Sequence, residues 1–243
     1  MVLVTRLVYN SHMPTESRYF DERFFYHVYN CGVEKRNIFI ESSDILHFVK
    51  TANYYQHDHN ICFTDYERLD SESRKIYLKR NPQSSDSLRV KIIAYCLMPN
   101  HFHFLIRPNR EDGISLFISE LSNSYTRYFN LKNERIGHLF QGTFKSKEIR
   151  SEESLLQVSR YIHLNPYNSS KTNPKGELNF GEYPYFSYFS WINNAPHPTG
   201  VKLDNNELKR WLEVVGGRKV YKSFVESMIW KRVDLEIGFL ALE

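Results

Sequence analysis

Cysteine is scarce in this sequence of 243 residues: there are only three, Cys31, Cys62 and Cys96, and no two form a CxxC pair. An odd number of scattered cysteines argues against both a disulfide framework and a thiolate zinc site. The fold must then be held by its apolar core, and 41% hydrophobic with 15% aromatic residues suffice for one substantial core. We expect the cysteines to be free thiols.

Long apolar runs are also missing. No uninterrupted apolar stretch approaches the roughly 20 residues that a membrane span needs. The N-terminus lacks the long apolar segment and small-residue cleavage site of a secretory signal. We therefore expect a cytoplasmic protein with no membrane partner. Met1–His12 has no clear place before the first expected strand, so Met13 is a hypothetical alternative start.

The positive charge of this chain is modest in total, but it is concentrated in one segment. The whole chain has a formal net charge of +4, and the segment Leu121–Arg150 alone carries six cations against two acids. Aromatic residues are interleaved with these cations, a mixture that pairs phosphates and stacks unpaired bases. The cations are Arg127, Lys132, Arg135, Lys145, Lys147 and Arg150, and the aromatic residues include Tyr125 and Phe140. A solvated basic face is the alternative interpretation.

Three β-strands are indicated by runs of aromatic and branched residues. They are expected over residues 24–30, 90–98 and 101–107, and Pro99-Asn100 supplies the tight turn of a hairpin between the last two. Residues 139–149 look like extended chain leading to another strand. The strands and helices mix without a regular βαβα alternation, so the expected class is α+β, an antiparallel sheet with helices packed on it.

Helices are expected where apolar residues recur every three or four positions. One is capped by Ser42 or Ser43 and runs to about Tyr55, and a long one follows Gly113. The last core helix begins near Ser151 and is expected to stop at Pro166. The polar residues 62–89, with a short helical pattern over 72–78, are predicted to be a surface insertion.

The most informative feature is a pair of histidines, His101 and His103, inside an apolar alternating run. Residues i and i+2 of a strand point to the same face, so the two imidazoles project together and can present a metal ion. Phe102 and Phe104 face the opposite way, toward the core. The spacing alone is weak, because His57 and His59 repeat it in a polar loop.

A polar stripe marks the last expected helix. Gln157, Tyr161 and Asn165 recur every four residues and therefore share one face of it. A buried tyrosine with a hydrogen-bonded hydroxyl is the usual structural explanation for such a residue, and this chain contains 17 tyrosines. The pattern by itself does not assign catalysis to Tyr161.

Five blocks in order resemble the single-tyrosine HUH transposases, in particular REP-associated tyrosine transposases and their insertion-sequence relatives. The blocks are residues 26–30, 94–107, 123–130, 137–146 and 160–166. The resemblance covers about residues 24–190. It implies three parts: a leader over 1–23, an HUH catalytic domain over 24–190, and a helical tail over 191–243.

The resemblance also implies a fold and a site. The fold is a ferredoxin-like or RRM-like antiparallel sheet with the histidine pair on a central strand. His101 and His103 match the HUH histidines, Tyr161 matches the catalytic tyrosine, and Asn165 falls where relatives carry a third, polar metal ligand. Gln157 has no such support. The implied cofactor is Mg²⁺ or Mn²⁺, although two imidazoles suit softer metals better.

The implied activity is metal-dependent cleavage and strand transfer of DNA through a 5′-phosphotyrosine. The implied partner is single-stranded or hairpin DNA from a palindromic repeat, bound by a monomer or a homodimer. We predict that Arg127, Arg135, Lys145 and Lys147 hold the DNA backbone, and that Tyr125 or Phe140 stacks a base, with packing as the alternative for each aromatic ring.

Two other functions remain open from the sequence. One is a domesticated protein that binds single-stranded DNA without catalysis. The other is a metal-dependent phosphodiesterase that uses water in place of Tyr161.

Overall fold

A computed structural model describes residues 18–169, 172, 183–193 and 200–227. Most of the expected leader, with the alternative start at Met13, lies outside these residues. The described chain forms one four-stranded antiparallel sheet in the order β2-β3-β1-β4. Its strands are β1 (Phe25–Cys31), β2 (Val90–Met98), β3 (His101–Pro108) and β4 (Lys145–Ile149). The predicted α+β class is confirmed, and the histidine pair lies on a central strand.

Eight α-helices are described around this sheet. They are α1 (Ser42–Tyr55), α2 (Phe63–Arg68), α3 (Ser71–Arg80), α4 (Gly113–Lys132), α5 (Glu152–Asn168), α6 (Tyr188–Ile192), α7 (Asn205–Val214) and α8 (Arg218–Glu226). A short 3₁₀ helix spans Val33–Lys35. None of the helices in the described ranges is long and apolar enough to span a membrane.

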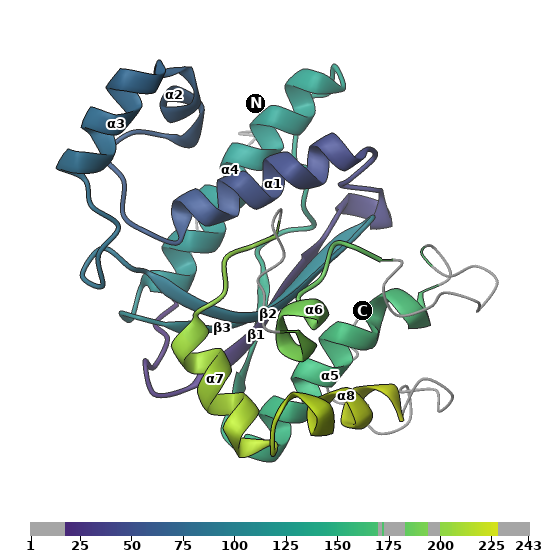
Figure 1. Ribbon diagram of the computed structural model, residues 1–243. Coiled ribbons are helices and arrows are strands. Elements are labelled where there is room, and N and C mark those ends of the chain that lie inside the picture. Colours follow the sequence, from purple (N-terminus) through teal and green to yellow (C-terminus); the bar gives the residue numbers. More distant parts are fainter. Residues whose placement is uncertain (1–17, 170–171, 173–182, 194–199, 228–243) are drawn as a thin grey trace, which may run out of the picture.

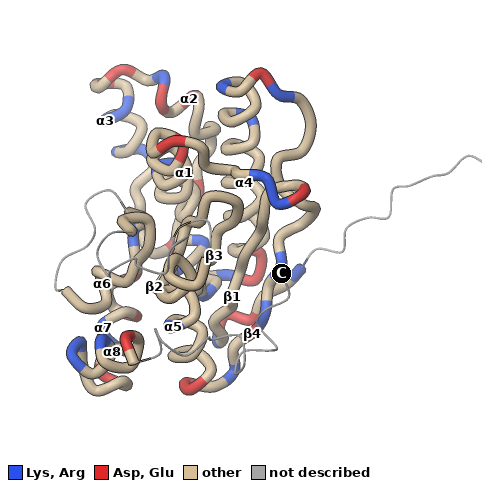
Figure 2. The backbone as a smooth tube through the Cα atoms, turned by 90° about the vertical axis from the view of Figure 1, so that its right-hand side faces the viewer, with Lys and Arg blue, Asp and Glu red and all other residues tan. Residues whose placement is uncertain are grey.

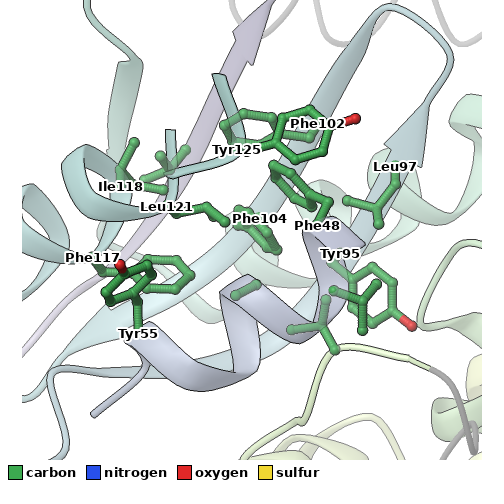
Figure 3. Packing of buried hydrophobic residues seen from close by; sticks show 14 of the residues in the cluster. Phe48, Tyr55, Tyr95, Leu97, Phe102, Phe104, Phe117, Ile118, Leu121 and Tyr125 are labelled. Atoms are coloured by element: carbon green, nitrogen blue, oxygen red, sulfur yellow. The ribbon is translucent and has the colours of Figure 1, made fainter. Parts of the chain in front are cut away.

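The sheet separates two apolar cores. Helices α1 and α4 cover one face, whereas α5 to α8 lie on the other side (Figure 1). Phe102 and Phe104 of β3 are fully buried under α1 and α4, where they meet Phe48 (Figure 3). Leu105 of the same strand belongs to the other core. The period of two in β3 therefore sends its phenylalanines to one face and its histidines to the other.

Hydrogen bonding at helix ends explains where α1 and α5 begin. Ser151 accepts a hydrogen bond from the backbone N–H of Ser154 at 3.1 Å and caps α5, as predicted. The start of α1 differs from the prediction. There the carboxylate of Asp44 accepts from the backbone N–H groups of Ile40 and Glu41, so neither Ser42 nor Ser43 is the cap.

Two helix boundaries also differ from the sequence prediction. Helix α5 does not stop at Pro166 but runs to Asn168, because a proline in the last turn removes only one backbone hydrogen bond. Residues 130–138 are predicted from the sequence to be a polar loop, but helix α4 continues to Lys132, three residues into this segment. The expected insertion over residues 62–89 holds α2, which was not predicted, and α3, which extends the predicted short helix at both ends.

Candidate active site

The two histidines of β3 lie on the sheet face that α5 covers. Their side chains are almost completely buried, with exposed fractions of 8% for His101 and 1% for His103. The two rings are perpendicular, with centroids 4.9 Å apart. Two imidazoles are thus held side by side on a hydrogen-bonded strand, where their backbone positions are fixed by pairing on both sides.

Helix α5 crosses over these imidazoles and brings two further side chains to them. Asn165 Oδ1 lies 3.2 Å from His101 Nε2, and Asn165 Nδ2 lies 3.3 Å from His103 Nε2. Tyr161, one turn earlier and half-buried, presents its ring edge-to-face to His103 with centroids 5.6 Å apart. Residues from two sequence segments about 60 positions apart therefore form one cluster.

The donor atoms fit a divalent ion. Adjacent ligands of an octahedral ion with bonds of 2.0–2.1 Å are separated by about 3 Å, close to the spacing of these side chains. Both ring nitrogens of His101 also face an amide oxygen, Asn100 Oδ1 at 2.9 Å and Asn165 Oδ1 at 3.2 Å. A neutral imidazole can donate to only one of them. A cation between Nε2 and Asn165 Oδ1 would satisfy both atoms.

A third histidine, His27 of β1, orients His103. Its Nε2 lies 2.9 Å from His103 Nδ1, and its side chain is 1% exposed. Asn165 Nδ2 donates to His103 Nε2, which must therefore keep its lone pair, so His103 carries its proton on Nδ1 and donates it to His27. A hydrogen bond of this kind fixes the tautomer and ring orientation of a metal ligand.

Burial keeps these histidines neutral. Desolvation lowers the pKa of His27 to about 3, with a smaller contribution from the positive charge of Lys147. The pKa of His103 is lowered well below its usual value, chiefly by burial and further by His101 and His27. Neutral imidazoles are the form that coordinates a metal, so the buried sheet face holds these rings in that form.

Helix α5 is held in place from behind by a histidine with a structural role. His163 is fully buried, with Nδ1 2.7 Å from the hydroxyl of Tyr221 in α8 and Nε2 2.8 Å from Ser187 Oγ. Burial lowers the pKa of His163 to about 3, so its ring is a neutral hydrogen-bonding link. This link ties α5 to α8 and to the start of α6, and so supports Tyr161 and Asn165 from behind.

The predicted DNA-binding lysines flank the histidines. Strand register pairs Lys145 with Tyr29 and Lys147 with His27, so both lysines project from β4 on the face that carries the site. Both are exposed. Figure 2 shows blue segments of the tube at β4, where basic residues lie. Strand β4 is an edge strand, so a nucleic acid could approach this part of the face from the open side.

The predicted arginines lie elsewhere. Arg127 is exposed on α4, which covers the opposite face of the sheet. Arg135 is half-buried, donates to Asn130 Oδ1 at 3.1 Å and lies over the ring of Phe129. Neither is brought to the histidine cluster. Gln157 of α5 accepts a hydrogen bond from the guanidinium of Arg160.

The two aromatic residues predicted to stack a base are buried. The ring of Tyr125 is fully buried beside Phe48, and its hydroxyl donates to the carbonyl of Ile38 at 2.6 Å (Figure 3). Phe140 is 7% exposed and packs against Phe102. This corrects the stacking prediction for Tyr125, whose ring has no open face; packing, the stated alternative, describes it.

Sequence reasoning gave no role to His27, although the residue stood in the first of the five blocks. It is 76 positions away from His103, and only the antiparallel register of β1 and β3 brings the two rings together. The available signal was its alternation with Tyr26 and Val28, both apolar core residues. That alternation places His27 on the same sheet face as the HUH pair once the strands are paired.

Two histidines on a central strand of an α+β sheet, with an amide and a tyrosine from a crossing helix, make up the candidate site. The family model "Transposase IS200 like" matches residues 50–165, just under half of the chain, and this range contains His101, His103, Tyr161 and Asn165. The match confirms the resemblance predicted from the five blocks. The chain is thus similar to the IS200-like transposases.

A solved structure described as a REP-associated tyrosine transposase bound to a REP hairpin is 14% identical, with a TM-score of 0.46, and the alignment covers 84% of this chain and 93% of that chain. A likeness at this level carries no argument about function. No curated protein sequence matches the chain.

Proposed function

We propose that this protein is a DNA transposase that cleaves and rejoins single-stranded or hairpin DNA through a covalent tyrosine intermediate. One observation carries the proposal: Asn165 lies 3.2 Å from His101 and 3.3 Å from His103, and the ring of Tyr161 packs edge-to-face on that of His103. The similarity to IS200-like transposases over residues 50–165 supports it.

Tyr161 is the proposed nucleophile. Its hydroxyl loses a proton and attacks the scissile phosphorus, forming a bond from the tyrosine oxygen to the 5′ phosphate as the bond to the 3′ oxygen breaks. The leaving 3′ oxygen takes up a proton and becomes a free hydroxyl. Because one phosphodiester replaces another, a different 3′ hydroxyl can reverse the step and join the DNA without an external energy source.

The proposed ligands are His101 Nε2, His103 Nε2 and Asn165 Oδ1. A divalent ion bound there, Mg²⁺ or Mn²⁺, would polarise the phosphate and neutralise the charge that develops on it. His27 Nε2 accepts a hydrogen bond from the N–H of His103 Nδ1, which keeps the proton on Nδ1 and the lone pair of His103 Nε2 directed into the site. Burial excludes bulk water from the imidazoles.

The proposed substrate is unpaired DNA next to a hairpin. A phosphate beside the buried histidines must come close to the sheet, which an unstacked, flexible strand can do more readily than a rigid duplex. Lys145 and Lys147 on edge strand β4 are the proposed backbone contacts nearest the site. Arg127 and Arg135 remain proposed contacts for DNA that extends around the molecule.

The decisive experiment is a denaturing-gel assay for a covalent adduct. The protein is incubated with labelled hairpins that carry single-stranded flanks, taken from imperfect palindromes around its gene, in Mn²⁺ or Mg²⁺. We expect a protein-linked product from the parent chain and none from Tyr161→Phe. Tyr167→Phe, at another tyrosine of α5, is the matched control and should keep the adduct.

The same assay separates the two alternative functions. Cleavage that persists in Tyr161→Phe without an adduct would show that water is the nucleophile and would refute tyrosine catalysis. Binding of hairpins without any cleavage by the parent chain, in both metals, would identify a DNA-binding protein that has lost catalysis.

A further inference from the structure

A pocket lies away from the histidine cluster, between α4 and the loop over residues 138–144. Its volume is about 270 Å³. Six of its lining residues matter here: Asn30, Ser119, Asn123, Thr126, Phe140 and Thr143. Ser119 and Asn123 are exposed, so the pocket opens to solvent along α4.

This pocket is built largely from two of the five sequence blocks. Residues 123–130 contribute from α4, and residues 137–146 contribute the loop. Neither block supplies a proposed metal ligand or the proposed nucleophile. The residues that carry the resemblance to the transposases therefore gather at two places, the histidine cluster and this pocket.

The loop that forms one wall is fixed at three points. The backbone N–H of Val33 donates to the carbonyl of Leu139 at 3.0 Å, and that of Gln141 donates to the carbonyl of Cys31 at 2.8 Å. Asn130 Nδ2 donates to the carbonyl of Gly137 at 2.8 Å. The pocket is thus preformed, which lowers the entropy cost of binding a ligand there.

The lining is uncharged: no Lys, Arg, Asp or Glu of the described chain contributes to it. Phenylalanine rings, including that of Phe140, provide an apolar wall, while amides and hydroxyls provide donors and acceptors. Such a lining suits a flat, neutral group with hydrogen-bonding edges and disfavours a bare phosphate. The volume is near the lower limit for small-molecule sites, roughly 300 Å³, and so suits one base better than a base pair.

Two cations adjoin lining residues of the pocket in the sequence, Arg127 on α4 and Lys145 on edge strand β4, where its side chain faces the histidine side of the sheet. Arg127 follows the lining residue Thr126 in α4, and Lys145 follows the lining residue Phe144 at the start of β4. Both basic side chains are exposed. A neutral pocket with cations nearby matches a nucleotide within a DNA strand, because its base is uncharged and the phosphate on each side of it is negatively charged.

The pocket is connected to the proposed active site through β1. Asn30 lines the pocket, and the preceding residue, Tyr29, pairs with His103 on one side and with Lys145 on the other. Successive residues of a strand face opposite sides of the sheet. A DNA strand crossing edge strand β4 would therefore pass from the pocket on one face to the histidines on the other.

We propose that this pocket binds a single unpaired nucleobase of the DNA, and that Arg127 and Lys145 hold the phosphates on either side of it. The proposal rests on the proposed function, because it assumes a single-stranded DNA ligand. It assigns a role in positioning DNA to Phe140 and Arg127, which lie away from the histidine cluster.

The test is a binding titration of Tyr161→Phe protein in EDTA, so that neither cleavage nor metal contributes. Labelled hairpins from the flanks of the gene are compared with versions in which each unpaired nucleotide in turn is made abasic. Stacking of one base on an aromatic ring corresponds to roughly a 5- to 150-fold change in affinity. We expect one abasic position to weaken binding within this range.

Two tryptophan variants test whether this base binds in the pocket. Ser119→Trp fills the pocket from an exposed helix position, and Leu131→Trp is the control at another exposed position of the same helix. Ser119→Trp should bind the unmodified hairpin as weakly as the abasic one, and Leu131→Trp should behave as the parent. If Ser119→Trp keeps the full abasic penalty, the base binds elsewhere and the pocket proposal is wrong. If the unsubstituted protein binds none of the hairpins, the proposed function itself fails.

Discussion

Four of the ten histidines form two pairs of identical spacing, His57 with His59 and His101 with His103. In the first pair each ring is satisfied by its immediate surroundings. His57 Nδ1 lies 3.1 Å from Ser87 Oγ, and His59 Nε2 lies 2.9 Å from a backbone carbonyl. In the second pair the Nε2 atoms converge on one amide from a different element.

The surroundings, and not the spacing, decide what the two pairs can do. The ring of His59 stacks on that of Tyr54 with centroids 3.6 Å apart, and its Nδ1 lies 3.1 Å from the hydroxyl of Tyr77. Both ring nitrogens of His59 are thus used in hydrogen bonds, which connect the expected insertion to α1. A regular strand, in contrast, turns two imidazoles to one face and leaves their Nε2 atoms to a crossing helix.

The largest effect should come from replacing one histidine of each pair by alanine and comparing the two variants. His101→Ala removes a proposed metal ligand, and we expect adduct formation to slow by roughly 100-fold or more, since charge neutralisation by a bound metal contributes several kcal/mol. His57→Ala should leave the rate near that of the parent. Single-turnover adduct formation measures both. Similar losses in the two variants would mean that His101 acts only through the fold.

Asn165 should contribute less than the histidines. Asn165→Ala removes one oxygen ligand, and we expect Mn²⁺ affinity to fall roughly tenfold, whereas Asn165→Asp keeps an oxygen, adds charge and should bind at least as tightly. Electron paramagnetic resonance of free Mn²⁺ measures the affinity without DNA. Asn168→Ala at the exposed end of the same helix is the control. Unchanged affinity in Asn165→Ala would remove this residue from the ligand set.

His27 should act through His103. Loss of an outer partner of a metal ligand typically weakens metal binding about 10- to 100-fold, and we expect His27→Ala to fall at the lower end. His27→Gln offers an amide oxygen that can accept from His103 Nδ1 and should restore part of the affinity. The same Mn²⁺ titration reports both variants. If Gln and Ala are equally impaired while the protein stays folded, the hydrogen bond does not orient His103.

The first pair should matter for stability alone. His59→Ala removes a stacked ring and two hydrogen bonds, and we expect the free energy of unfolding to fall by about 1–3 kcal/mol with the adduct rate unchanged. Urea denaturation measures the stability. A slower adduct reaction in a variant that remains fully folded would contradict a purely structural role.

The smallest effect is the pH dependence of that stability difference. Burial lowers the pKa of folded His59 to about 4, below the 6.5 of the unfolded chain. Between these values the unfolded state binds the extra proton, so the stabilisation by His59 is complete above pH 6.5 and declines as the pH falls toward 4. Urea midpoints of the parent and His59→Ala should therefore converge on acidification. A constant difference would show that the His59 pKa is not lowered.

Much of the sheet could be predicted because its signals are local. The run from Val90 to Arg107 is mostly apolar, contains one turn dipeptide and gives a hairpin whose strands match the structure to within one residue. The cap of α5 at Ser151 was equally local. Such features depend only on residues that are neighbours in the chain, so they can be predicted from the sequence.

Features that depend on distant partners could not be predicted. The burial of Tyr125 depends on Phe48 and on the carbonyl of Ile38, which reach it from another helix and a loop. The partnership of His27 with His103 depends on strand register. The site was therefore visible in the sequence as separate motifs, while the contacts that orient its side chains were not.

The bond from His163 to Tyr221 has a consequence for the order of biosynthesis. A ribosome releases β3, with both of its imidazoles, more than 100 residues before it releases α8. Until then His163 lacks the hydroxyl that holds it at 2.7 Å, and the helix bearing Tyr161 and Asn165 lacks its final support. The nascent chain would thus carry the sheet half of the proposed site well before the helix half is locked against it, and the site would be completed only after α8 has been released.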